Sequence, residues 1–130
     1  MSQVPCILMV DSDILVRQPI GAYLRECGYA VIEAASTDEA LLILENGNPR
    51  IDIMLADVKA SGSVDGFSLA RWVRMKHPSI KVVLAGSVTT ETAEAADLCD
   101  EGPKLATPYD PQVLLDRIKV LLASRDRNSS

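Results

Sequence analysis

The 130-residue sequence lacks the long apolar and basic segments that are typical of membrane proteins and of nucleic-acid-binding proteins. No run of about eighteen apolar residues occurs, and the start of the chain has no basic region followed by a long apolar stretch. Thirteen Lys and Arg against eighteen Asp and Glu give a net charge of -5, with no basic run before the C-terminal tail. We therefore expect a soluble, cytoplasmic protein that binds neither membrane nor nucleic acid directly.

Cysteine is also scarce, and the three cysteines match no recognisable disulfide or metal-binding motif. Cys6, Cys27 and Cys99 are odd in number and widely spaced, and they have no CxxC motif or histidine-rich companion. This pattern argues against both a disulfide framework and a zinc site. The sequence predicts three buried or half-buried thiols, as in a cytosolic protein.

The composition is that of a single globular domain, because 48% of the residues are apolar and the chain is long enough to bury a core. No low-complexity segment, linker or repeat marks a second domain. We expect one domain over residues 1–123 and a polar tail over residues 124–130.

Five short apolar runs alternate with segments of helical periodicity. The predicted strands are residues 4–10, 29–34, 51–56, 82–85 and 104–106, and the predicted helices begin near residues 14, 37, 67, 90 and 113. Short strand–helix–strand crossovers require parallel strands, with helices on both faces. The sequence predicts an α/β fold with a five-stranded parallel sheet in the flavodoxin-like order 2-1-3-4-5.

The helices carry recognisable end signals. Ser12 or Asp13 is the expected N-cap of the first helix and Gly28 its stop, while Pro19 should kink that helix without breaking it. The third helix should begin after Asp65-Gly66 and turn Phe67, Ala70 and Val73 toward the core.

Two carboxylates follow neighbouring strands of this predicted sheet. Asp11 ends the first apolar run and Asp57 ends the third, and the order 2-1-3-4-5 places those two strand ends side by side. Paired carboxylates suit a hard divalent cation such as Mg²⁺ and leave room for a phosphate oxygen. The alternative is that both acids only cap turns.

From about Ile7 to Leu122 the chain resembles the receiver domain of two-component response regulators. The resemblance rests on Met9-Val10-Asp11-Ser12-Asp13, on Asp57 after an apolar strand, on Asp65-Gly66, and on Thr107-Pro108-Tyr109. It implies that Asp57 accepts a phosphoryl group from a histidine kinase or phosphotransfer protein. It also implies that Mg²⁺ is held by Asp11, by Asp57 and by the main-chain oxygen of Lys59.

Three positions depart from that family pattern. The family's second acid after the first strand is here Ser12, a weaker metal ligand, and Asp13 is better placed to cap the helix. The family's lysine before the last proline is here Thr107, which can hydrogen-bond a phosphoryl oxygen but carries no charge. The phosphoryl-binding hydroxyl falls on Gly86 or Ala85, with Ser87 next along; Ser87 either serves in its place or only caps the following helix.

Three hypotheses remain open. The first is a stand-alone receiver, not an enzyme, that signals to an unknown downstream protein through its fourth and fifth helices. The second is a phosphorylation-independent pseudo-receiver that acts as an interaction module or homodimer. The third is a flavodoxin-like cofactor binder. It is weakest because no Ser/Thr/Gly-rich phosphate loop follows the first strand, and Asp11-Ser12-Asp13 would repel a phosphate unless a metal intervened.

Overall fold

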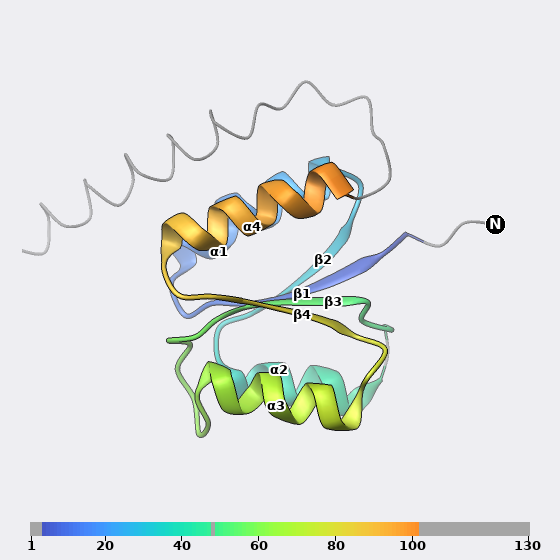
Figure 1. Cartoon of the computed structure of the whole chain (residues 1–130), viewed down its shortest axis with the longest axis vertical. Coiled ribbons are helices and arrows are strands. Elements are labelled where there is room, and N and C mark those ends of the chain that lie inside the picture. The colour runs from blue at the N-terminus through green and yellow to red at the C-terminus, as the bar shows by residue number, and fades with distance from the viewer. Residues whose placement is uncertain (1–3, 48, 102–130) are drawn as a thin grey trace, which may run out of the picture.

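The computed structural model describes residues 4–47 and 49–101, which form alternating strands and helices around one parallel sheet (Figure 1). The elements are β1 (Cys6–Val10), α1 (Ile14–Glu26), β2 (Ala30–Ala34), α2 (Thr37–Asn46), β3 (Ile53–Asp57), α3 (Gly66–Lys76), β4 (Lys81–Ala85) and α4 (Val88–Glu101). The strand order is β2-β1-β3-β4, which confirms the predicted α/β class and the first four positions of the predicted order. The predicted fifth strand, the last helix and Thr107 lie outside the described residues.

Side chains alternate in direction along the strands, which divides the hydrophobic core between the two faces of the sheet. In β1, Leu8 and Val10 pack on one face with Leu44 of α2 and Leu69 of α3. The intervening Ile7 and Met9 pack on the other face with residues of α1 and α4. Because successive strand residues point to opposite faces, β1 is buried throughout and reads as a continuous apolar run.

The helices begin at side-chain caps that satisfy backbone N–H groups left unpaired in the first turn. Asp13 Oδ1 accepts from Leu15 N at 2.9 Å, Ser36 Oγ accepts from Glu39 N at 3.1 Å, and Asp65 Oδ1 accepts from Ser68 N at 2.7 Å. Capping by Asp13 is thus confirmed, and α1 continues through Pro19 as predicted. None of the helices within residues 4–47 and 49–101 has the length and apolar character to cross a bilayer.

The third helix corrects one predicted core residue. Phe67 is 59% exposed, whereas Leu69, Ala70 and Val73 form the buried face of α3. Because Gly66 is the buried first residue of α3, the inward face runs through positions 66, 69, 70 and 73 and turns Phe67 outward. Trp72 packs against the same core.

The fourth helix lies on the same face of the sheet as α1, while α2 and α3 cover the opposite face (Figure 1). A right-handed crossover that continued outward beyond β4 would leave this helix beside α3. Ala95 and Leu98 instead join the core formed by Ile20, Tyr23 and other residues of α1. The placement was not predicted from sequence, and it brings α4 next to the helix that follows Asp11.

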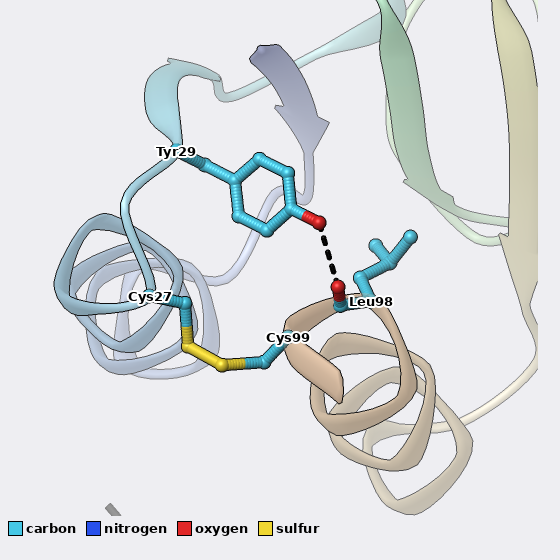
Figure 2. Close-up of a disulfide and its surroundings, with 4 residues drawn as sticks. All are labelled: Cys27, Tyr29, Leu98 and Cys99. Atoms are coloured by element: carbon cyan, nitrogen blue, oxygen red, sulfur yellow. Dashed lines mark hydrogen bonds between the residues drawn. A yellow bond between two sulfur atoms is a disulfide. The ribbon is translucent and has the colours of Figure 1, made fainter. Parts of the chain in front are cut away.

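A disulfide between Cys27 and Cys99 joins the end of α1 to α4, which corrects the prediction of three free thiols (Figure 2). The two residues lie 72 positions apart, with their Cα atoms at 5.6 Å, so only the tertiary fold brings them together. Beside the bond, the Tyr29 hydroxyl donates to the main-chain oxygen of Leu98 at 2.6 Å. Cys6 is the buried free thiol of the described residues.

The disulfide should stabilise the fold mainly through the unfolded chain, because it closes a long loop. We expect Cys27→Ser/Cys99→Ser to lower the free energy of unfolding by roughly 2–4 kcal/mol. Urea denaturation with and without a thiol reductant measures the effect. The reductant should destabilise the wild-type chain and leave the double variant unchanged; equal reductant sensitivity in both would contradict a Cys27–Cys99 bond.

Candidate functional site

The two acids predicted to meet at the strand ends do meet there. Val10 of β1 pairs with Ala56 of β3, so Asp11 and Asp57 follow in register at the carboxyl ends of adjacent parallel strands. Both side chains line a cavity of about 310 Å³, whose other lining residues are Asp13, Val16, Lys59, Gly86 and Ser87. A water molecule occupies about 30 Å³ of liquid, so this cavity can hold a hydrated ion together with a small anion.

Asp11 is a buried carboxylate held from several directions. Only 2% of it is exposed, and its Oδ1 accepts a hydrogen bond from Asp13 N at 2.8 Å. Its main chain donates to Ala34 O of β2 at 3.1 Å and accepts from Arg17 Nη1 of α1 at 2.9 Å. The carboxylate therefore has a fixed place at the floor of the cavity.

Asp57 is the last residue of β3 rather than the first residue after it, and it is only half-buried. Its Oδ1 accepts from Lys59 N at 3.2 Å, and Val58 N donates to Ala85 O of β4 at 3.0 Å. These bonds hold the turn after β3 against the neighbouring strand. The carboxylate can thus be reached from solvent while its backbone is fixed.

Gly66 allows the start of α3 to approach the same turn. A Cβ built at this residue would lie 2.6 Å from Asp57 O and 2.7 Å from Val58 Cα, both of them backbone atoms. Gly66 N also donates to Val58 O at 3.3 Å. The Asp65-Gly66 pair therefore combines a helix cap with a residue small enough to pack against the Asp57 turn.

The hydroxyls of the other predicted site residues, Ser12 and Ser87, are hydrogen-bonded to neighbouring residues. Ser12 Oγ accepts from Ser61 N at 2.8 Å and bonds Ser61 Oγ at 3.0 Å, so its hydroxyl faces the loop after β3 and does not line the cavity. Ser87 does line the cavity, but its Oγ lies 3.2 Å from both the backbone N and Oγ1 of Thr90 in the first turn of α4. The predicted ligand role of Ser12 and the phosphoryl-binding role of Ser87 remain predictions.

Glu91 of α4 is a member of this acidic group that sequence reasoning missed. Its side chain is 1% exposed, and its Oε1 has no hydrogen-bond partner among the described residues. Burial, followed by a hydrogen bond to the Asp11 carboxyl and the charges of Asp11 and Asp57, raises the pKa of Glu91 from its ordinary value of 4.5 to about 10. Glu91, Ala95 and Leu98 are spaced i, i+4 and i+7, which was the available signal that Glu91 faces inward.

The donor chemistry of the site suits Mg²⁺, which prefers carboxylate and carbonyl oxygens. Asp11, Asp57 and the main-chain oxygen of Lys59 would hold such an ion, and the orphaned Oε1 of Glu91 is a further oxygen beside them. Across the described residues, no three His, Cys, Asp or Glu side chains form a ready-made metal cluster. Mg²⁺ usually keeps several waters and needs only one or two carboxylates, so the residues present fit it.

Residues 7–119 match the family model of the response regulator receiver domain. The transcriptional regulatory protein AruR of Pseudomonas aeruginosa is 30% identical over 127 residues, which cover 94% of this chain and 51% of AruR. The sensor kinase CckA of Brucella abortus is 33% identical over 122 residues, covering 92% of this chain and 13% of CckA. The chain thus spans about half the length of the first of these curated relatives and a smaller share of the second.

The solved structures that are similar include the chemotaxis response regulator CheY4 of Vibrio cholerae. It aligns with a TM-score of 0.59 at 25% identity, covering 92% of this chain and 99% of CheY4. The likeness therefore extends over the parallel sheet that carries Asp11 and Asp57.

We expect Gly66→Ala to destabilise the fold by about 1–3 kcal/mol, since its Cβ would overlap the backbone at Asp57 and Val58. Gly86→Ala is the matched control, because a Cβ at that cavity-lining glycine meets nothing within 4 Å. Urea denaturation of both variants measures the difference. Equal stability of the two variants would contradict the close packing at Gly66.

We expect the metal-free chain to lose stability as the pH rises above 4.5, because Glu91 stays protonated in the fold up to about pH 10 while the unfolded chain ionises. Glu91→Gln should remove this penalty and raise the free energy of unfolding by on the order of 3 kcal/mol at pH 7. Near pH 4 the variant and the wild type should be about equal. The control is Glu94→Gln, at a partly exposed site on the same helix; identical pH profiles for Glu91→Gln and wild type would contradict the burial of a neutral Glu91.

Proposed function

We propose that this chain, which belongs to the response regulator receiver family, accepts a phosphoryl group on Asp57 within a two-component phosphorelay. The observation that carries the proposal is the pairing of a half-buried Asp57 with a buried Asp11 in register at one cavity. The donor is a histidine kinase or a phosphotransfer protein. Phosphorylation would then change contacts with a downstream protein.

The proposed step is nucleophilic attack by the Asp57 carboxylate on phosphorus. Lys59 N holds Oδ1, which leaves Oδ2 as the attacking oxygen. The new bond joins Oδ2 to phosphorus, while the bond from phosphorus to the donor breaks and its electron pair leaves with the donor. A bound Mg²⁺ would supply positive charge that offsets repulsion between the carboxylate and the phosphoryl group.

The support for the phosphoryl group on this chain is weaker than in the family pattern. Ser87 supplies a hydroxyl after β4 that lines the cavity, and it would have to exchange its contact with Thr90 for a phosphoryl oxygen. Thr107 is proposed to donate a second hydrogen bond without the charge of a lysine. We therefore propose that the phosphorylated state couples weakly to its conformational readout.

The second candidate function is a phosphorylation-independent interaction module, including a homodimer. Exposed apolar residues favour it, because Ile14 and Leu15 at the start of α1 are 49% and 43% exposed and Phe67 at the start of α3 is 59% exposed. All three belong to the helix starts that follow the strand ends of the site. A partner could contact them whether or not Asp57 is modified.

The test of phosphorylation is incubation of the chain with Mg²⁺ and a small-molecule phosphodonor, followed by intact mass spectrometry. We expect one phosphoryl group on the wild-type chain and none on Asp57→Asn, because the amide is not nucleophilic. Asp52→Asn is a matched control, since Asp52 lies before the same strand and away from the cavity.

An adduct that persists in Asp57→Asn would identify a different acceptor. Absence of any adduct on the wild-type chain would contradict the phosphorelay proposal and favour the interaction module.

A further inference from the structure

We propose that Glu91 is a ligand of the divalent cation at this site, supplying from α4 the second acidic oxygen that Ser12 does not supply after β1. The proposal rests on the proposed function only in that the cavity at Asp11 and Asp57 takes a divalent cation. It adds a residue from a helix that follows β4 to a site otherwise built at the ends of β1 and β3.

Glu91 is a buried acid with one oxygen left unsatisfied. Its side chain is 1% exposed and Oε1 has no hydrogen-bond partner among the described residues. Such an oxygen costs free energy that an apolar side chain of similar size would avoid. A bound cation is the kind of ligand that satisfies a buried carboxylate.

The Glu91 carboxyl lies among other acidic side chains. The charged groups that act on its carboxyl are Asp11, to which it is hydrogen-bonded, and Asp57. Two cations lie nearby: Lys59 lines the cavity, and Arg17 of α1 directs Nε to Glu33 Oε1 at 3.0 Å and Nη1 to the main-chain oxygen of Asp11 at 2.9 Å. Asp11 and Asp57 line the cavity, and Glu91 reaches Asp11 from α4 behind it. A divalent cation would offset the repulsion that arises when Glu91 ionises beside these two carboxylates.

Helix α4 holds Glu91 firmly in this position. Glu91 N donates to Ser87 O at 2.9 Å, and Ser87 lines the cavity, so the helix begins at the rim of the site. Farther along, Ala95 and Leu98 pack into the core of the α1 face. The Cys27–Cys99 disulfide and the Tyr29–Leu98 hydrogen bond fix the end of the same helix (Figure 2).

The contact between Glu91 and Asp11 leaves room for this role. The two side chains share a hydrogen bond, and the described residues form no ready-made cluster of three metal-binding side chains. Mg²⁺ needs only one or two carboxylates and completes its shell with water, for which the cavity of about 310 Å³ has room. Metal binding would exchange the carboxyl–carboxyl contact for oxygen–metal contacts.

The test is titration of the full chain with metal alone, using calorimetry for Mg²⁺ and electron paramagnetic resonance for Mn²⁺. We expect Glu91→Gln to weaken the affinity for both ions by at least about tenfold, because the amide removes a carboxylate ligand. Glu94→Gln, at a partly exposed site on the same helix, should bind both ions like wild type. Glu91→Leu is a second variant that keeps the buried position filled, and it should lose affinity to a similar extent; circular dichroism confirms that each variant is folded.

Unchanged or tighter binding by Glu91→Gln and Glu91→Leu would overturn the proposal, as would failure of the wild-type chain to bind either ion at millimolar concentration. Because no phosphodonor is present, these outcomes are separate from the phosphorylation test. A wild-type chain that binds metal through Glu91 but is never phosphorylated would support this inference while contradicting the proposed function.

Discussion

The parallel pairing of β1 with β3 is the constraint on which the rest of the structure depends. Val10 opposite Ala56 places Asp11 and Asp57 at one edge of the sheet, and a shift of one residue would turn one of the two carboxylates away from the other. The same pairing separates Leu8 and the α2–α3 core from Ile7 and the α1–α4 core. Fold and site therefore follow from a single register.

The packing of α4 against the α1 face adds a buried acid to this site. The helix carries Glu91 beside Asp11 and is held there by Leu98 in the core and by the Cys27–Cys99 disulfide. A buried neutral acid lowers the stability of the metal-free chain at neutral pH, which is a cost that a functional site can retain. The site that we propose is built from two strand ends and one helix.

The features that rest on local patterns could be predicted from the sequence. Asp11 and Asp57 were identified because each ends an apolar strand, and Asp65-Gly66 because an N-cap and a small residue open a helix. Phe67 was wrongly predicted to face the core. Helical spacing identifies the buried face of a helix only once the first residue of that helix is known.

Features that depend on tertiary placement could not be predicted. Cys27 and Cys99 are separated by 72 residues, and only packing of α4 on α1 makes them neighbours. Glu91 falls at an inward position of a helix whose buried face was not predicted, so nothing in the local pattern assigned it to the site. The roles of Ser12 and Ser87 remain predictions, although their hydroxyls bond to Ser61 and Thr90.

The most direct measurement is a crystal structure of the chain with Mn²⁺ and beryllofluoride, a mimic of the phosphoryl group, with the metal located by its anomalous scattering. We predict beryllofluoride on the Asp57 carboxylate and a single metal peak among the oxygens of Asp11, Asp57 and Glu91. A metal peak elsewhere, or an Asp57 carboxylate without the adduct under saturating conditions, would contradict this prediction.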